Sequence, residues 1–252
     1  MELTLRVEGL SFGYRGRPVL HDVTLPEVRT SQVTAVVGPN AAGKSTLLRC
    51  IAGLHRARGT VRIDGSVAGR SGIFYLPQEP LPASSLTVFE AVLLARRLGP
   101  GAGAGGPDDV TEVADTLVRL RLDDLATTPL GNMSGGQRQL VALAQAVVRR
   151  PEVLLLDEPV SNLDLRNQLR VLTLVRELAA EQSTAVLVTV HDLTLAARFA
   201  DEAIVLCDGA VHASGTPDEV ITAQMLREVY RVEGDVRRGE DGTLTVAAHR
   251  SL

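Results

Sequence analysis

The chain is poor in several residue types, and each shortage narrows what it can be. It contains no tryptophan and only 3% aromatic residues, so its core must consist of Val, Leu, Ile and Ala. No stretch approaches the roughly 18–20 apolar residues that span a bilayer, and the N-terminus lacks the apolar core of a signal peptide. We therefore expect a cytosolic protein, with any membrane role supplied by a partner.

Cysteine and excess positive charge are also scarce. Cys50 and Cys207 lack the spacing of a metal site, and two thiols in an intracellular chain more often stay reduced in the core. The net charge is −4 and the isoelectric point is near 5.8, which argues against a broad basic surface. We expect no nucleic-acid partner, because such partners are held mainly through neutralised phosphates.

Lysine occurs once, at Lys44, while all other residues among the 26 Lys and Arg are arginine. It lies in residues 38–45, Gly-Pro-Asn-Ala-Ala-Gly-Lys-Ser, which match the phosphate-loop pattern. A compact point charge suits a site wrapped around phosphates better than the planar fork of arginine. Lys44 would reach the β- and γ-phosphates of ATP, and the Ser45 hydroxyl would bind Mg²⁺. A chance glycine turn is the alternative, but the lone lysine favours nucleotide binding.

The backbone of this loop would supply most of the phosphate contacts. Gly38 and Gly43 let N–H groups close on the phosphates, and the helix that follows adds its dipole. Ala41 stands where glycine is commonest, and we expect it to be tolerated with a negative φ. The nucleotide-binding residues predicted here are Gly38, Pro39, Asn40, Ala41, Ala42, Gly43, Lys44, Ser45 and Thr46.

Two acidic residues end a short apolar run further along the chain. Asp157 and Glu158 follow residues 153–156, which read as a buried strand. In open α/β sheets ligands gather at the carboxyl ends of strands. Asp157 is placed to hold Mg²⁺, and Glu158 could polarise the attacking water as a general base. The alternative is that both residues are solvated acids without a catalytic role at the end of a core strand. The presence of a phosphate loop in the same chain favours the catalytic interpretation.

A second helix start with glycines lies at residues 134–137, Ser-Gly-Gly-Gln. Ser134 and Gln137 match a capping box at the start of a helix expected over 137–150. Gly135 and Gly136 are poor helix formers, and a cap alone does not require them. They are explained if a phosphate approaches bare backbone N–H groups. We therefore predict a second anion-binding helix start.

The order of elements indicates an α/β fold. Residues 2–37 read as short strands, beginning with 3–7, a glycine-containing turn, and ending with 33–37. Short apolar runs then alternate with helices, which predicts a mainly parallel sheet covered on both faces. The stretch 86–125 reads as a helical insert interrupted by a flexible glycine-rich linker at 99–107. The last twenty residues are charged and turn-rich, and no element is predicted there.

These motifs in this order resemble the ATP-binding subunit of ABC transporters, over roughly residues 3–230. The resemblance implies a P-loop NTPase core with a mainly parallel sheet, an N-terminal antiparallel β subdomain and a helical insert. It implies an ATP-binding domain over 1–230, with the helical subdomain inserted at about 79–150. A C-terminal extension covers 231–252.

The resemblance also implies roles for residues that carry little signal alone. Gln78 is the Q-loop glutamine, which takes part in catalysis and binds Mg²⁺, and His191 is the switch histidine that contacts the γ-phosphate. Tyr14 stacks on adenine, and Asp164 belongs to the D-loop, residues 161–164, at the nucleotide. Without the resemblance these would be an ordinary loop residue, a structural histidine and an edge-strand tyrosine.

Partners follow from the same resemblance. Two subunits pair head to tail, as a homodimer or with a second ATPase subunit, so that residues 134–137 of one close over ATP bound by the other. Transmembrane permease subunits and an extracytoplasmic substrate-binding protein complete the system. The chain is then expected at the cytoplasmic side of the cell membrane, as a peripheral subunit.

The C-terminal half looks like the group that imports ferric siderophores, haem and cobalamin. The residues that carry this likeness are 164–169, 191–201, 215–220 and 225–230. An ABC ATPase for another substrate, such as a metal ion, is an alternative. A soluble ABC ATPase acting on ribosomes or DNA usually carries two cassettes, and a kinase would not explain Ser134 or His191. An exporter is disfavoured because no membrane segment is fused to the chain.

Overall fold

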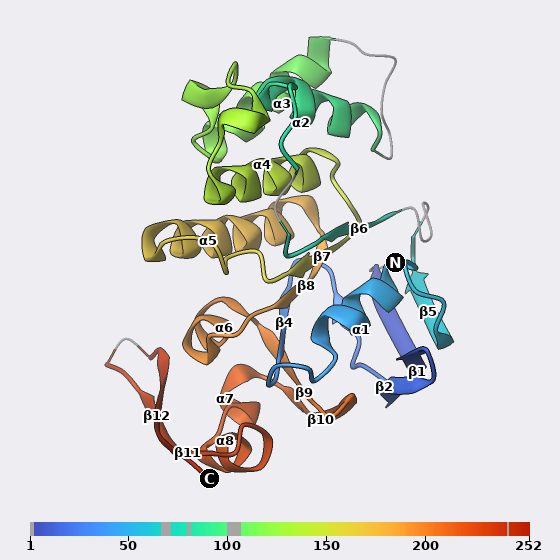
Figure 1. Ribbon diagram of the computed structural model, residues 1–252, viewed down its shortest axis with the longest axis vertical. Coiled ribbons are helices and arrows are strands. Elements are labelled where there is room, and N and C mark those ends of the chain that lie inside the picture. Colours follow the sequence, from blue (N-terminus) through green and yellow to red (C-terminus); the bar gives the residue numbers. More distant parts are fainter. Residues whose placement is uncertain (1–2, 67–71, 80–81, 100–106, 241) are drawn as a thin grey trace.

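A mainly parallel sheet forms the centre of the computed structural model, which describes residues 3–66, 72–79, 82–99, 107–240 and 242–252 (Figure 1). In these ranges the sheet has six strands in the order β10-β9-β4-β8-β7-β6. All neighbours pair in parallel except β9 and β10. The strands are β4 Val33–Val37, β6 Ile73–Leu76, β7 Val153–Asp157, β8 Ala185–Thr189, β9 Glu202–Cys207 and β10 Ala210–Gly215. The predicted α/β fold is confirmed.

An antiparallel sheet lies beside it, formed by the N-terminal part of the chain. Its strands are β1 Thr4–Tyr14, β2 Arg17–Val23, β3 Val28–Arg29 and β5 Arg58–Asp64. The turn expected after residue 7 is wrong, because β1 continues through Gly9 to Tyr14. Gly9 has φ 64°, and the pairing of β1 with β5 shifts register between Glu8 and Ser11. The glycine therefore permits a bulge within a strand instead of a turn.

Helices cover both faces of the parallel sheet. Helix α1, Lys44–Ile51, lies on the side of the antiparallel sheet, and α5, Leu165–Gln182, lies on the other side. Beyond α5, at the top of Figure 1, are α2 Val88–Arg97, α3 Pro107–Arg119 and α4 Gly135–Val148, with the 3-10 turns η2 Asp123–Leu125 and η3 Leu130–Asn132. These form the helical insert. The predicted linker at 99–107 falls mostly outside the described residues.

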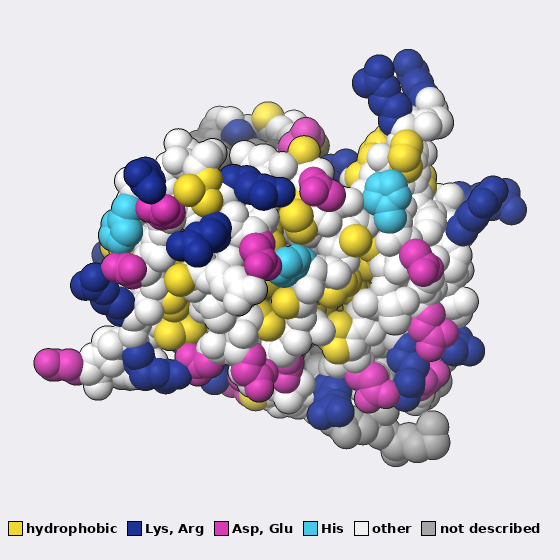
Figure 2. Space-filling model, turned by 90° about the horizontal axis from the view of Figure 1, so that it is seen from below, with side chains coloured by type: hydrophobic (Ala, Val, Ile, Leu, Met, Phe, Trp, Pro, Cys, Tyr) yellow, Lys and Arg dark blue, Asp and Glu magenta, His cyan; other side chains and the backbone are white. Residues whose placement is uncertain are grey.

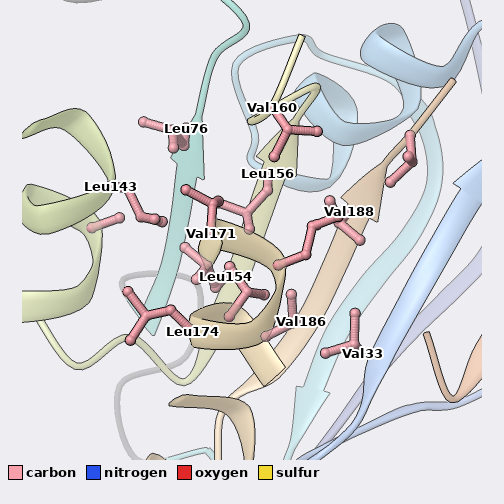
Figure 3. Packing of buried hydrophobic residues seen from close by; sticks show 14 of the residues in the cluster. Val33, Leu76, Leu143, Leu154, Leu156, Val160, Val171, Leu174, Val186 and Val188 are labelled. Atoms are coloured by element: carbon pink, nitrogen blue, oxygen red, sulfur yellow. The ribbon is translucent and has the colours of Figure 1, made fainter. Parts of the chain in front are cut away.

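The core is aliphatic, as the shortage of aromatic residues requires. Residues of β7 alternate between two buried clusters, with Leu154 and Leu156 on the α5 side and Val153 and Leu155 on the α1 side. On the α5 side they pack with Val171 and residues of the neighbouring strands (Figure 3). Strands buried on both faces can meet a ligand only at their ends, and in open α/β sheets ligands bind at the carboxyl ends.

The C-terminal region contains a hairpin that the sequence analysis did not predict. Helix α6, Leu193–Phe199, precedes β9, and the short helices α7 Pro217–Val220 and α8 Ala223–Val229 follow β10. Strands β11 Val232–Arg238 and β12 Leu244–Ser251 then pair antiparallel. Val236 and Val246 pack against the main core cluster, and the Val246 N–H donates to the Thr194 hydroxyl at 3.3 Å. The boundary at residue 231 stays a prediction.

Candidate active site

The loop at residues 38–45 joins β4 to α1, and its glycines are required by its shape. Gly38 has φ 148° and Gly43 has φ 101°, values that L side chains rarely adopt. A Cβ on Gly38 would lie 2.1 Å from the Leu206 carbonyl oxygen, and one on Gly43 would lie 2.9 Å from Leu20 Cδ2. The backbone can therefore close tightly only with glycine at both positions.

Ala41 differs from the expectation. Its φ is 66°, so the negative φ on which its tolerance was expected to rest is not found. A left-handed alanine costs about 1 kcal/mol because its Cβ approaches the following carbonyl oxygen. The loop therefore holds Ala41 in a left-handed backbone conformation that glycine would adopt at lower energy.

Lys44 begins α1, and its side chain turns back along the loop. Its Nζ donates to the carbonyl oxygens of Gly38 at 2.7 Å and of Pro39 at 3.0 Å, and the side chain is 6% exposed. Burial lowers the pKa of Lys44, while the charges of Glu158 and Asp157 act in the opposite direction. The single lysine is thus a buried cation facing two carboxylates at the carboxyl end of β7.

Asp157 is fully buried and accepts three hydrogen bonds from hydroxyl groups. Ser45 and Thr189 donate to Oδ1 and Tyr75 donates to Oδ2, each at 2.9 Å. Arg49 Nε donates to the Tyr75 hydroxyl oxygen at 3.1 Å. Burial raises the pKa of Tyr75 to about 12, so the hydroxyl remains a donor. The carboxylate is therefore held at both oxygens.

The donors around Asp157 fit Mg²⁺, which prefers oxygen ligands and is often held by one or two carboxylates with substrate phosphates. The Ser45 hydroxyl donates a hydrogen bond to the Asp157 carboxylate. Gln78 bonds to Glu158 through Nε2, and its side-chain oxygen takes no part in that bond. Among the described residues, no group of three or more His, Cys, Asp or Glu could hold a metal. The Ser45 and Asp157 oxygens beside the phosphate loop suit a metal that arrives with a phosphate ligand.

Glu158 is the second carboxylate, and its two oxygens have different partners. Oε1 bonds to His191 Nε2, and Oε2 accepts from Gln78 Nε2 at 2.6 Å. The backbone N–H donates to the Thr189 hydroxyl at 2.8 Å. Glu158 has φ 49°, an unusual value for a non-glycine residue, which these bonds maintain. The structure thus brings together the predicted base, the predicted switch histidine and the predicted Q-loop glutamine.

A pocket of about 300 Å³ opens over this group. It is lined by residues 40–46 of the loop together with Val19, Glu158 and His191. A larger hollow of about 670 Å³ lies against α3 but contains no phosphate-binding element. The smaller pocket is therefore the candidate site, because it joins the glycine loop to Glu158 and His191.

The other predicted phosphate site lies elsewhere on the chain. Ser134 and Gln137 form the predicted capping box of α4, which begins two residues earlier than expected because Ser134 is its cap. A Cβ on Gly135 would meet nothing within 4 Å, so the backbone there is open. Asp164 caps α5 by accepting from the Asn167 N–H at 2.8 Å. None of these residues lines the pocket of their own chain.

Tyr14 also lies outside the pocket lining. Its ring meets Phe12 and His55 edge-on, at centroid distances of 4.9 Å and 5.3 Å, and its hydroxyl bonds to His55 Nε2 at 2.8 Å. The side chain is 42% exposed, so one part of the ring faces solvent. Its stacking on adenine stays a prediction.

Sequence reasoning missed Thr189, Tyr75 and Arg49. Thr189 ends a second buried strand, which is the same signal that pointed to Asp157. Tyr75 precedes Gln78 by three positions, and Arg49 lies one helical turn after Ser45. Their roles depend on the strand order β6-β7-β8, which the sequence does not state.

Charged side chains are mixed on the face shown in Figure 2, where Arg and Asp or Glu are interspersed around hydrophobic patches. No helix in the described part of the chain is long and apolar enough to cross a membrane. The absence of a nucleic-acid partner stays a prediction.

Comparison with known proteins identifies similar chains. A family model described as "ABC transporter" matches residues 20–161. A hemin import ATP-binding protein of Streptomyces coelicolor is 40% identical, covering 99% of this chain and 91% of its own. An iron(3+)-hydroxamate import ATP-binding protein of Bacillus subtilis is 34% identical, covering 92% and 90%. A solved chain from a proposed metal-chelate type ABC transporter, in an inward-facing conformation, aligns with TM-score 0.82 and 27% identity, covering 98% and 97%.

Proposed function

The chain belongs to the ABC transporter family, and on that premise we propose that it is the ATP-hydrolysing subunit of an importer. The substrate is an iron chelate, namely a ferric siderophore, haem or cobalamin, which passes through separate membrane subunits. Relatives that import hemin and iron(3+)-hydroxamate support this class. The observation that carries the proposal is the contact of Glu158 with both His191 and Gln78, over the phosphate loop.

The chemistry follows from these contacts. The loop N–H groups and Lys44 bind the phosphates, and Glu158 accepts the proton of the attacking water as general base. His191 and Gln78 orient the Glu158 carboxylate, one at each oxygen. Bound Mg²⁺, held by Ser45, Asp157 and Gln78, would neutralise phosphate charge.

Replacement of the base tests this assignment. Glu158→Gln keeps the shape of the side chain but cannot accept a proton, so we expect hydrolysis to fall at least about a hundredfold. Binding of a fluorescent ATP analogue should stay within about twofold of the parent chain. Glu177→Gln, an exposed change on α5, is the control and should leave both unchanged. Hydrolysis by Glu158→Gln near the parent rate would contradict the assignment.

The site is completed by a second copy or by a second ATPase subunit in a head-to-tail dimer. Within residues 134–137, the N–H groups of Ser134 and Gln137 are bonded in the capping box, which leaves those of Gly135 and Gly136 for a phosphate, and none of the four residues lines the pocket of its own chain. A phosphate bound at Lys44 of one subunit is then covered by Ser134 of the other. Asp164 and the adenine-stacking Tyr14 complete the nucleotide contacts. This arrangement explains why one chain has one phosphate loop and one separate phosphate-binding helix start.

The remaining partners are permease subunits and an extracytoplasmic substrate-binding protein, which place this chain at the cytoplasmic side of the membrane. Residues 1–230 form the ATP-binding domain, and 231–252 form its extension. Loss of the gene should lower uptake of one radiolabelled substrate among ferric siderophore, haem and cobalamin. Unchanged uptake of all three would exclude the proposed substrate class while leaving the ATPase assignment intact.

A further inference from the structure

A chain of hydrogen bonds outside the phosphate loop ends on Asp157. Arg49 of α1 donates to the Tyr75 hydroxyl at 3.1 Å, and Tyr75 of β6 donates to Asp157 Oδ2 at 2.9 Å. Three separate elements therefore meet at one carboxylate. Neither Tyr75 nor Arg49 lines the nucleotide pocket, and the hydrolysis chemistry leaves both without a role.

The two oxygens of Asp157 differ in how they are held. Ser45 and Thr189 both donate to Oδ1, whereas Tyr75 is the donor to Oδ2 among the described contacts. The torsion that turns a carboxylate about its Cβ–Cγ bond is broad and weakly restrained by the side chain itself. A carboxylate held at one oxygen can rotate, and one held at both cannot. Tyr75 therefore decides which way the carboxylate plane faces.

Arg49 fixes the direction of the Tyr75 hydroxyl hydrogen. A phenolic oxygen both donates and accepts, and Arg49 occupies its acceptor side as a donor that has no acceptor atoms. The hydrogen is then left to point at Asp157. The pKa of Arg49 is raised, and the largest cause is its hydrogen bond to Tyr75. The Tyr14 hydroxyl makes a smaller contribution in the same direction.

We propose that Tyr75 and Arg49 are positioning residues that hold the Asp157 carboxylate in the orientation needed for Mg²⁺ beside Ser45. The proposal rests on the proposed function, because it takes Asp157 and Ser45 as the protein's contacts to the metal of Mg-ATP. Supporting groups that hold a metal ligand typically change metal affinity or activity by about 10–100-fold when removed. We therefore expect the two residues to affect the Mg²⁺ dependence of ATP hydrolysis and to leave the binding of metal-free nucleotide unchanged.

Removal of the Tyr75 hydroxyl tests this role in the full chain. For Tyr75→Phe we expect the Mg²⁺ concentration for half-maximal ATP hydrolysis to rise about tenfold. Binding of a fluorescent ATP analogue in EDTA should stay within about twofold of the parent, because no phosphate contact is removed. A loss of analogue affinity in EDTA as large as the change in Mg²⁺ dependence would show a merely structural role and overturn the proposal. An unchanged Mg²⁺ dependence would overturn it as well.

Arg49 gives an independent test that keeps the Tyr75 ring in place. Arg49→Met should shift the Mg²⁺ dependence in the same direction, and Arg49→Lys should restore part of it by donating to the same hydroxyl. The double variant should be no worse than Tyr75→Phe alone, since the two act through one bond to Asp157. Arg62→Met, an exposed change on β5, is the matched control. If the shifts in Mg²⁺ dependence add up in the double variant, Arg49 and Tyr75 do not act through the same hydrogen bond to Asp157.

Asp157→Asn separates the inference from the function on which it rests. If the parent chain hydrolyses no ATP with Mg²⁺, the proposed function itself fails. If the parent hydrolyses ATP and Asp157→Asn does not, while Tyr75→Phe and Arg49→Met match the parent at every Mg²⁺ concentration, only the positioning role is excluded.

Discussion

At the scale of single residues, the pocket depends on polar side chains that hold one another. Asp157 and Glu158 are both buried, and their carboxylate oxygens have hydroxyl, amide or imidazole partners. Removing one partner leaves a buried charged acceptor unsatisfied, which costs more than the net value of the bond. These residues therefore act as a set, and single substitutions will show coupled effects.

Ala41 offers a prediction that concerns backbone strain alone. With φ 66°, this alanine sits in a region that favours glycine, so Ala41→Gly should raise the free energy of unfolding by about 0.5–1 kcal/mol. Ala52→Gly, at a position with φ −65°, should instead lower it. Urea unfolding measures both. A loss of stability in Ala41→Gly would show that the loop does not hold this strain in solution.

The sequence predicted those site residues whose positions are set by a local pattern, such as a loop of fixed spacing or the end of a buried strand. Lys44 and Ser45 belong to a loop of fixed spacing, and Asp157 and Glu158 end a buried strand. Thr189 and Tyr75 escaped prediction because their contact with Asp157 requires β6, β7 and β8 to be neighbours. Strand order is a property of the whole sheet, so no local pattern contains it.

At the scale of elements, α4 and α2 begin with the same capping box, which α7 also has, but α4 and α2 differ in surroundings. Ser134 and Gln137 cap α4, and Thr87 and Glu90 cap α2. The sequence analysis predicted the first box from the spacing of Ser134 and Gln137. In both, the side-chain oxygen accepts from the backbone N–H three residues on, which satisfies one of the free donors of a helix start.

The two caps give a matched pair of variants. Thr87→Ala and Ser134→Ala should each lower the free energy of unfolding by about 1 kcal/mol. Only Ser134→Ala should also lower ATP hydrolysis, by at least about tenfold, because its hydroxyl is proposed to face phosphate of the partner subunit. Urea unfolding and steady-state hydrolysis measure the two effects. Equal hydrolysis by both variants would remove Ser134 from the site.

Other elements were mispredicted for physical reasons. Gly9 reads as a turn because glycine commonly supplies a positive φ there, but β1 uses that freedom for a bulge opposite β5. The hairpin of β11 and β12 is charged and short of apolar residues, so its pattern is weak. Its few valines pack against residues of the main core cluster. Tertiary packing thus decides structure that local pattern does not.

At the scale of the whole molecule, each chain would supply half of each of two sites in the proposed head-to-tail dimer. The pocket of one copy is lined by the phosphate loop and the proposed base, Glu158, while the helix start at Gly135 lies in another part of the same chain. The C-terminal hairpin packs near α6, which directly follows His191 and Asp192. Helix α6, which follows the predicted switch histidine, therefore packs against the C-terminal hairpin.

The most direct test of the shared site is the mass of the Glu158→Gln chain in solution with ATP and Mg²⁺, measured by analytical ultracentrifugation. Without hydrolysis the nucleotide should hold two copies together, giving twice the 26.8 kDa of one chain. Addition of Ser134→Arg should keep analogue binding but return the mass to that of one chain. An ATP-bound Glu158→Gln chain that stays at 26.8 kDa, or a dimer that survives Ser134→Arg, would contradict the account.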